Sequence, residues 1–290
     1  MKNEKSPILI AEIGCNHRGS ITTAKEMIKI AAEFCKADVV KFQKRNNKEL
    51  LTFEEYNNPH PNPAFSYGKT YGEHREFLEF SLDQNIELMD YCKKFKIIFS
   101  TSVWDPTSAA EIISLKPKMI KVPSAINTDK RVLELLFEKY DGQIHISLGM
   151  TKKTEIEKLI SLAKTHGRLK DVVLYHCISG YPVENKELYL KEIQILKDHY
   201  EEQVLGIGFS GHHKGIAVDI AAYTIGASYF ERHFTLDRTW KGTDHSASLE
   251  PDGLRRLKRD LMETEKALSY KPLEILEIEN VQRKKLKKFF

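Results

Sequence analysis

The sequence is poor in cysteine and has no long apolar segment. No apolar run in its 290 residues approaches the ~20 residues that a membrane-spanning helix needs. The first residues, MKNEKSP, lead into a short apolar stretch without a small-residue cleavage site, which argues against a signal peptide. We therefore expect a cytoplasmic protein that does not span a membrane.

The few cysteines exclude two common structural roles. Cys15, Cys35, Cys92 and Cys177 are scattered along the chain, and no two of them have the CxxC spacing of a zinc site. Thiols in such apolar segments are usually reduced and buried. A disulfide framework and a cysteine-bound zinc ion are therefore not expected.

The body of the chain has no excess of basic residues. The formal net charge is +4, but five basic residues lie in the terminal run 283–288, and without them the chain has 40 basic and 41 acidic residues. A nucleic-acid-binding domain usually carries a basic patch or stripe. Nucleic acid is therefore not an expected partner.

The sequence also lacks a glycine-rich nucleotide-binding loop. Residues 14–19 (GCNHRG), which follow the first candidate strand, match neither GxGxxG nor the P-loop pattern. Eight nearly continuous apolar runs, typical of strands covered on both faces, alternate with stretches of helical period. These runs are residues 8–13, 38–42, 97–101, 119–122, 144–148, 172–177, 204–209 and 227–232. Eight strand–helix units of this size predict an α/β protein with a (β/α)8 TIM barrel rather than a doubly wound open sheet.

Helical periodicity fills the intervals between these strands. Ala24, Met27 and Ile28 fall on one face of the first candidate helix, and a later one shows a capping box, Thr154 with Glu157, and a stop at Gly167. Further helices are expected at residues 106–115, 129–140, 185–199, 214–226 and 251–268. We assign residues 1–270 to the barrel domain and 271–290 to a C-terminal extension or helix.

One connection is unusually long. Between the second strand and its helix lie residues 44 to about 79, which are rich in Asn, Pro, Tyr and charge. A loop of this length in a compact domain is usually a functional lid or a mobile segment.

Polar side chains gather at the C-terminal ends of the predicted strands. In a barrel these ends converge on one face, where active-site groups lie. Two lysines there, Lys41 and Lys121, need an anionic partner if they are buried, and the surrounding hydroxyls suit phosphate and carboxylate. The full set is Glu12, Lys41, Gln43, Thr101, Lys121, Ser124, Ser147, Ser179, Tyr181, Ser210, His212, Glu231 and His233.

Two histidines at matching strand ends indicate a metal site. His212 and His233 follow neighbouring strands, and neutral imidazoles with oxygen ligands suit Mn, Fe, Co or Zn better than Mg. His17 and His245, on nearby loops, are rival ligands. His176 and His213 are expected to point away from the mouth, since strand residues alternate between the two faces. For Lys41 alone, a salt bridge at the barrel rim is an equally good interpretation.

Eight short motifs stand at the strand ends in a fixed order. They are residues 11–19 (AEIGCNHRG), 40–43 (VKFQ), 99–101 (FST), 120–124 (IKVPS), 147–150 (SLGM), 176–182 (HCISGYP), 210–212 (SGH) and 231–235 (ERHFT). Together, from about residue 7 to residue 268, they resemble the sialic acid (N-acetylneuraminate) synthase family. Members of that family condense phosphoenolpyruvate with an N-acylated amino sugar such as N-acetylmannosamine.

The resemblance implies a role for each strand-end residue. His212 and His233 would hold a divalent metal, usually Mn²⁺, with Mg²⁺ and Co²⁺ as alternatives, and Glu12 would lie beside it. The carboxylate side of phosphoenolpyruvate would contact Lys41, Thr101 and Ser124. Its phosphate would contact Lys121, Ser147, Ser179 and Ser210. The sugar pocket would include Gln43, Tyr181 and Asp244.

Four departures from the family pattern bear on the support of the metal, on the sugar and on assembly. Gly211 stands where members commonly have an Asp, Ile126 where many have an acidic sugar contact, and Ser179 where an Asn is usual. The chain also ends about where the family's C-terminal antifreeze-like domain is expected to begin. We therefore expect a single-domain member, and leave open both the sugar and a homodimer.

The sequence leaves three hypotheses for the function. The leading one is a phosphoenolpyruvate-dependent transferase, a synthase of a nonulosonic (sialic-acid-type) acid for surface polysaccharide, with a di-N-acylated or deoxy sugar as one candidate acceptor. The second is a related aldol synthase that uses phosphoenolpyruvate and a different sugar aldehyde. The third is a non-catalytic barrel scaffold, which predicts loss of the lysines or the histidine pair, yet both are present. A metal hydrolase would need more ligands than the strand ends supply.

Overall fold

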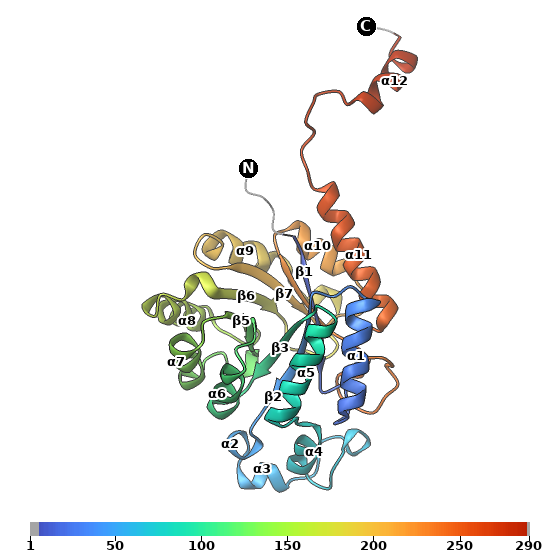
Figure 1. The fold of residues 1–290 in the computed structure, drawn as a ribbon. Helices are drawn as coiled ribbons and strands as arrows, with labels where there is room; N and C mark the ends of the chain where they lie inside the picture. Colours follow the sequence, from blue (N-terminus) through green and yellow to red (C-terminus); the bar gives the residue numbers. More distant parts are fainter. Residues whose placement is uncertain (1–5, 289–290) are drawn as a thin grey trace.

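The computed structural model describes residues 6–288, and its centre is a closed barrel of eight parallel strands (Figure 1). Each strand pairs with its neighbours in chain order, and the last pairs with the first. The strands are β1 (Ile8–Gly14), β2 (Val39–Lys44), β3 (Ile98–Val103), β4 (Met119–Val122), β5 (Gln143–Ser147), β6 (Val172–Cys177), β7 (Gly206–Gly211) and β8 (Tyr229–His233). The predicted (β/α)8 barrel is confirmed, and every predicted strand overlaps an observed one.

Strand residues alternate between two different environments. Those that face the helices, such as Leu9, Val40 and Phe99, belong to a large apolar core between the barrel and its outer layer. Those that face the barrel interior form a small apolar plug near the N-terminal ends of the strands, with Ile10 and Met119 among its members. Polar side chains lie nearer the C-terminal ends of the strands. The barrel interior is therefore apolar at the N-terminal end and polar at the C-terminal end, which we call the mouth.

The helices of the outer layer begin at polar caps. The side chains of Ser20, Ser81, Asp105 and Asp129 each accept a hydrogen bond from a backbone N–H in the first turn of the helix that follows. The layer consists of α1 (Ile21–Glu33), α5 (Leu82–Lys94), α6 (Pro106–Ser114), α7 (Lys130–Lys139), α8 (Lys153–Thr165), α9 (Lys191–Tyr200), α10 (Ala217–Thr224) and α11 (Pro251–Ala267).

Three predicted helix starts were wrong. The helix expected from residue 214 begins at Ala217. The helix expected from residue 185 begins at Lys191, because residues 185–187 form a separate 3-10 turn, η4 (Asn185–Glu187). The capping box placed at Thr154 lies two residues earlier, where the Glu155 side chain accepts from the backbone N–H of Lys152. Gly167 follows that helix with φ +68°, as the predicted stop requires.

The long connection after β2 is folded. It contains α2 (Asn47–Leu50), α3 (Phe53–Asn57), the 3-10 turn η1 (Pro63–Phe65) and α4 (Tyr71–Leu78). Both α3 and α4 begin with a reciprocal capping box, formed by Thr52 with Glu55 and by Thr70 with Glu73. These helices lie together beside the C-terminal ends of β2 and β3 (Figure 1). We refer to residues 45–79 as the lid segment.

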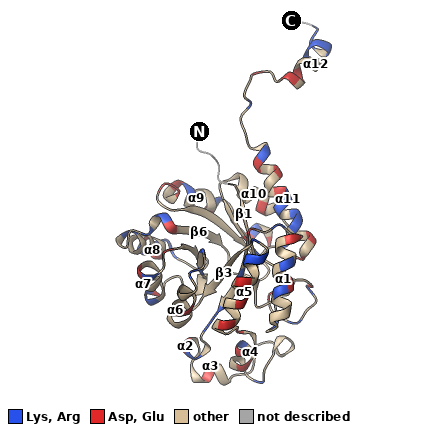
Figure 2. Cartoon of the chain, viewed as in Figure 1, with Lys and Arg blue, Asp and Glu red and all other residues tan. Residues whose placement is uncertain are grey.

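The C-terminal helix α12 (Glu277–Leu286) extends away from the barrel (Figure 1), and none of its residues is buried. Its last turns are basic, whereas positive and negative side chains are interspersed over the rest of the molecule (Figure 2). Among residues 6–288 no helix is long and apolar enough to cross a membrane.

Candidate active site

A cavity of about 410 Å³ opens at the C-terminal ends of the strands. All eight strands contribute at least one side chain to it, and the lid segment supplies much of the remaining wall. Of the sequence-predicted site residues, all but Thr101 line this cavity. They are Glu12, Lys41, Gln43, Lys121, Ser124, Ser147, Ser179, Tyr181, Ser210, His212, Glu231, His233 and Asp244.

The floor of the cavity holds two lysines and two glutamates. Lys41 Nζ lies 2.5 Å from Glu12 Oε2 and 3.7 Å from Glu231 Oε2. Lys121 Nζ donates to Glu231 Oε2 at 2.8 Å. Ser210 Oγ donates to the other oxygen of Glu231 at 3.1 Å. All four charged residues are at most 8% exposed, so their charges interact in a medium that screens weakly.

Burial and mutual attraction shift the pKa values of these four groups differently. Burial raises the pKa of Glu12, and the opposing charge of Lys41 does not cancel this rise. Burial also acts on Glu231, but Lys121 and Lys41 outweigh it and hold the pKa of Glu231 well below its usual range. Burial lowers the pKa of Lys121, whereas the carboxylates around Lys41 raise the pKa of that lysine despite its burial. The surroundings thus favour the ionised form of Glu231, whereas Glu12 takes up a proton more readily.

The structure brings the two predicted metal ligands together. The rings of His212 and His233 have centroids 5.4 Å apart, and the ring of Tyr181 lies 4.1 Å from that of His212. His212 Nδ1 is 3.0 Å from the carbonyl oxygen of Ile178, so Nε2 is left for a ligand. Burial, and then the nearby His233, lowers the pKa of His212 to about 4, so this imidazole is neutral at pH 7.

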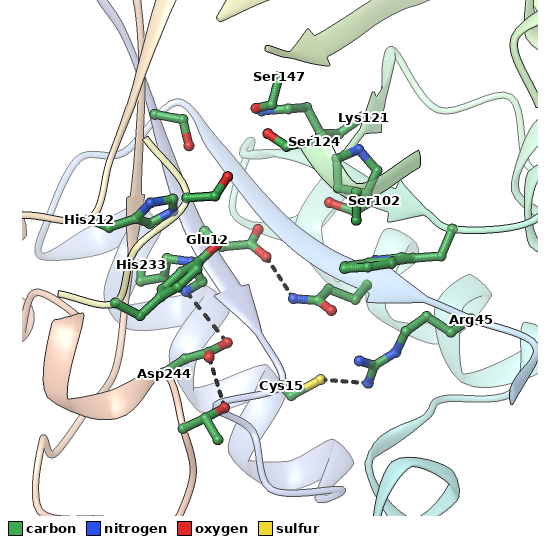
Figure 3. Close-up of a pocket in the computed structure, with 18 of the residues that line it drawn as sticks. Glu12, Cys15, Arg45, Ser102, Lys121, Ser124, Ser147, His212, His233 and Asp244 are labelled. Atoms are coloured by element: carbon green, nitrogen blue, oxygen red, sulfur yellow. Dashed lines mark hydrogen bonds and ion pairs between the residues drawn. The ribbon is translucent and has the colours of Figure 1, made fainter. Parts of the chain in front are cut away.

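The histidine pair fits a cation that is completed by water or substrate oxygens. Nδ1 of His233 is buried without a hydrogen-bond partner and lies 3.7 Å from Asp244 Oδ2 (Figure 3). Between residues 6 and 288 no three His, Cys, Asp or Glu side chains are grouped to hold a metal ion by themselves. Two imidazoles in a polar cavity, one of them with an orphaned ring nitrogen, are a suitable partial ligand set for a first-row divalent ion.

The other histidines lie elsewhere. His17 stacks on Phe80 at 4.0 Å, and Nδ1 of His245 is 2.7 Å from Thr235 Oγ1; neither residue lines the cavity. His176 and His213 also point away from the cavity, as predicted from strand alternation: His176 Nε2 reaches the carbonyl of Leu188.

Thr101 is the one predicted contact that the structure does not bring to the cavity. Its neighbours on β3, Ser100 and Ser102, face the barrel interior, so Thr101 faces the helices and is fully buried. Ser102, one residue later, is the β3 hydroxyl that reaches the cavity. Its Oγ accepts from Lys41 Nζ at 2.6 Å and it lines the cavity.

The hydroxyls on the opposite wall are crowded around one glycine. Ser124 Oγ accepts from the backbone N–H of Gly149 at 3.0 Å. A Cβ built on Gly149 would lie 2.3 Å from Ser179 Oγ and 2.7 Å from Ser124 Oγ. Only glycine therefore allows these two serines to approach the same point of the backbone.

The lid segment adds residues that sequence reasoning did not identify. Arg45, His60, Tyr71, His74, Arg75 and Leu78 line the cavity. In Figure 3, Arg45 lies across the cavity from His212 and apart from Lys121 and Ser147. Composition indicated that the segment was a lid or a mobile loop, but not which of its side chains turn inward.

Comparison with known proteins identifies the family. The sequence profile described as the NeuB family matches residues 27–272, which is most of the chain. The chain belongs to the NeuB family. The predicted membership of the sialic acid synthase family, and with it the prediction of a synthase-type transferase, is confirmed.

Curated and solved members of the NeuB family cover nearly the whole chain. An N-acetylneuraminate-9-phosphate synthase from Mus musculus is 37% identical over 280 residues, 97% of this chain and 76% of the relative. An N,N'-diacetyllegionaminic acid synthase from Campylobacter jejuni is 34% identical over 265 residues, 91% of this chain and 78% of the relative. The crystal structure of an N-acetylneuraminic acid synthetase from Leptospira borgpetersenii, in complex with citrate, matches with a TM-score of 0.81 at 28% identity and covers 98% of this chain and 93% of that one. The relatives thus differ in the product that their names give.

Proposed function

We propose that this protein condenses phosphoenolpyruvate with the open-chain form of an N-acylated amino sugar, which gives a nonulosonic acid and inorganic phosphate. Family membership and one observation support this proposal. Lysines 41 and 121 meet the imidazoles of His212 and His233 in a single cavity. That combination offers an anion site and a metal site in one cavity, which is what a reaction between two bound molecules needs.

Phosphoenolpyruvate lies on the lysine side of the cavity in this proposal. Its phosphate contacts Lys121, and its carboxylate contacts Lys41 and Ser102. Ser102 replaces Thr101, the contact that the sequence predicted. Both lysines already face carboxylates, so an incoming anion is accommodated best when Glu12, whose pKa burial raises, is protonated. The hydroxyls assigned to the two anionic groups are Ser124, Ser147, Ser179 and Ser210.

The acceptor sugar lies between the histidines and the lid segment. Its aldehyde is at His212 and His233, which would hold a divalent ion, Mn²⁺ in our proposal and Mg²⁺ or Co²⁺ as alternatives. Such an ion supplies Lewis acidity toward a carbonyl oxygen. Gln43, Tyr181 and Asp244 contact the rest of the sugar.

The reaction forms one carbon–carbon bond and breaks one carbon–oxygen bond. The methylene carbon of phosphoenolpyruvate attacks the aldehyde carbon, whose oxygen takes a proton and becomes a hydroxyl. Water then adds to the former enol carbon and loses a proton to the carboxylate of Glu12, which is ionised once its own proton has passed to the aldehyde oxygen. The bond from that carbon to the phosphate oxygen breaks, phosphate leaves with the electron pair, and a ketone remains.

Phosphate release that depends on an amino sugar is the test of this proposal. Purified protein with Mn²⁺ and phosphoenolpyruvate should release phosphate only when an N-acylated hexosamine from a panel is added. With oxygen-18 in the bridging oxygen of phosphoenolpyruvate, the label should appear in the released phosphate, since the C–O bond breaks. Release without sugar, or no release with any sugar of the panel, would contradict the proposal. Release only with non-acylated sugar aldehydes would favour the related aldol synthase.

The pair Ser102 and Thr101 gives a matched prediction on phosphoenolpyruvate binding. Ser102→Ala removes the hydroxyl that accepts from Lys41, and a hydrogen bond to a charged group contributes about 1.5–3 kcal/mol. We expect the KM for phosphoenolpyruvate to rise about tenfold or more. Thr101→Val, on the helix-facing side of the same strand, should leave this KM within about twofold, since Thr101 Oγ1 has no hydrogen-bond partner. Equal effects of the two changes on steady-state kinetics would contradict the assignment of Ser102.

A further inference from the structure

A buried tyrosine ring packs against one of the two cavity lysines. The Nζ atom of Lys121 lies 3.8 Å from the ring centroid of Tyr175, which is on β6. Tyr175 is fully buried and does not line the cavity, so it influences a bound substrate only through Lys121. An ammonium group is attracted to the negative face of an aromatic ring, and the attraction is strongest where water is excluded. The ring is therefore an uncharged partner of a buried charge.

The carboxylate beside Lys121 is shared between two cations. Lys121 Nζ donates to Glu231 Oε2 at 2.8 Å, and the same oxygen lies 3.7 Å from Lys41 Nζ. Burial lowers the pKa of Lys121, and the attraction of Glu231 does not cancel this effect, in part because Lys41 opposes it. A buried ammonium group in this position gains from any further attraction, and the ring of Tyr175 supplies it.

Hydrogen bonds fix the Tyr175 ring from the neighbouring strand β5. Its hydroxyl lies 2.7 Å from His145 Nδ1, and His145 Nε2 lies 3.2 Å from Gln143 Oε1. Burial lowers the pKa of His145 well below its usual value, so this imidazole is neutral. The amide oxygen only accepts, so the single ring proton is on Nε2 and the Tyr175 hydroxyl donates to Nδ1. Hydrogen bonds in such a chain polarise one another, which makes the tyrosine ring richer in electrons and a better partner for a cation.

The strand on the other side of Tyr175 provides the space for the ring. Tyr175 pairs in register with Gly208 on β7. A Cβ atom built on Gly208 would lie 2.5 Å from both Cδ1 and Cε1 of the ring. Such a contact is much shorter than a van der Waals distance, so a side chain at position 208 would displace the ring. The glycine on β7 and the histidine on β5 together fix the ring beside Lys121.

We propose that Tyr175 is a positioning residue for phosphoenolpyruvate: its ring holds the Lys121 ammonium group at the cavity while that group exchanges Glu231 for the phosphate of the substrate. A second carboxylate would also stabilise the lysine, but it would repel the incoming phosphate, whereas the ring carries no net charge. Because the ring restricts the positions of the ammonium group, less ordering is left for the binding step. Without the ring, the ammonium group turns fully toward Glu231, and the phosphate must draw it back. This inference rests on the proposed function, which assigns the phosphate to Lys121.

Two substitutions at Tyr175 and one at a neighbouring tyrosine test the proposal. Tyr175→Leu removes the ring, and we expect the KM for phosphoenolpyruvate to rise about tenfold. Tyr175→Phe keeps the ring and should hold this KM within about threefold of the wild-type value. Tyr229→Leu makes the same change in the same apolar cluster but leaves the ring beside Lys121 in place, so this KM should stay within about twofold. The KM for the acceptor sugar should stay within about twofold in all three variants, because Tyr175 acts on the phosphate side alone.

Fluorinated phenylalanines at position 175 separate the charge of the ring face from the size of the ring. Mono-, di- and trifluorophenylalanine keep the shape of the ring but make its face progressively less negative, which weakens the attraction of a cation. They preserve the packing of the barrel interior, so the test holds even if Tyr175→Leu does not fold. The Kd for phosphoenolpyruvate, measured by calorimetry, should rise with each added fluorine. Values that do not depend on fluorination would overturn the inference.

Two kinetic outcomes would also overturn the inference. The first is an equal effect of Tyr175→Leu and Tyr175→Phe, because the hydroxyl rather than the ring face would then matter. The second is an equal effect of Tyr175→Leu and Tyr229→Leu, or an equal rise in the KM for both substrates, because the ring would then serve only the packing of the barrel.

Inorganic phosphate distinguishes failure of this inference from failure of the proposed reaction. In metal-free protein without sugar, calorimetry should detect phosphate binding that competes with phosphoenolpyruvate and that Tyr175→Leu weakens about tenfold. Such binding together with no turnover of any sugar would support the role of Tyr175 and contradict the proposed reaction. Turnover by a wild-type protein whose phosphate affinity equals that of Tyr175→Leu would support the reaction and overturn the inference.

Discussion

Replacing His233 by alanine is expected to lower kcat/KM by about 10³-fold or more while the barrel stays folded. The imidazole lies at the end of β8, and its ring is 5.4 Å from that of His212. In our proposal these two rings are the only protein ligands, so loss of either leaves the cation with one. A Lewis acid lowers the barrier of a carbonyl addition by several kcal/mol, and about 4 kcal/mol corresponds to about 10³-fold in rate.

Both Mn²⁺ binding and catalytic activity should be lost in the His233→Ala variant. Titration of Mn²⁺ by calorimetry or by its electron spin resonance signal should give one site in the wild-type protein and none in His233→Ala. Chelation of the wild-type protein should reduce activity to a similar level, and added Mn²⁺ should restore it. His199→Ala, a histidine on the exposed face of α9, serves as the control and should change neither quantity. Unchanged activity in His233→Ala would remove this residue from the metal site.

The barrel was predictable because its strands are covered on both faces. Such strands appear in the sequence as nearly continuous apolar runs. The polar residues at the end of each run indicate the C-terminal mouth of the barrel, even when the packing of the strands is unknown. Lys41, Lys121 and Glu231 were found in this way, and they do meet in the cavity. What the pattern did not provide was the partner of each charge, because the ion pairs join strands that are far apart in the sequence.

Thr101 illustrates the limit of strand-end reasoning. The predicted strand ended at residue 101, but β3 runs from Ile98 to Val103. A continuous apolar run contains no alternation from which to read the inward face, so an error of one residue exchanges the interior for the helix-facing side. The interior side chain is that of Ser102.

The lid segment shows a different limit. Its two capping boxes are visible in the sequence as Thr52 with Glu55 and Thr70 with Glu73, but we predicted only a lid or a mobile loop there and no helix. The inward direction of Arg75, however, depends on how α4 packs against the mouth of the barrel. No local pattern encodes that orientation, because a lone arginine on a short helix is normally solvated.

Behind β8, replacing Asp219 by asparagine is expected to destabilise the protein by about 3–5 kcal/mol, as removal of one partner from a buried ion pair does. Asp219, on α10, forms an ion pair with Arg232, and both side chains are at most 1% exposed. The same guanidinium donates to the carbonyl oxygens of His213 at 2.7 Å and Gly215 at 3.0 Å. The substitution would leave the Arg232 charge buried with hydrogen bonds but without a counter-ion.

Thermal unfolding should reveal this loss as a decrease in Tm of about 10 °C. Asp252→Asn is the matched control, since Asp252 pairs with Arg255 on the exposed face of α11, and exposed pairs contribute about 0–1 kcal/mol. If Asp219→Asn decreased Tm no more than this control, the buried pair would not stabilise the fold as we expect.

The Mn²⁺ affinity of Asp219→Asn should also fall, by about 10–100-fold, as for other groups that orient metal ligands. The reason is that Arg232 stands between Glu231 and His233 and hydrogen-bonds the backbone that follows His212. A decrease in Tm with unchanged Mn²⁺ affinity would limit the role of the pair to stability.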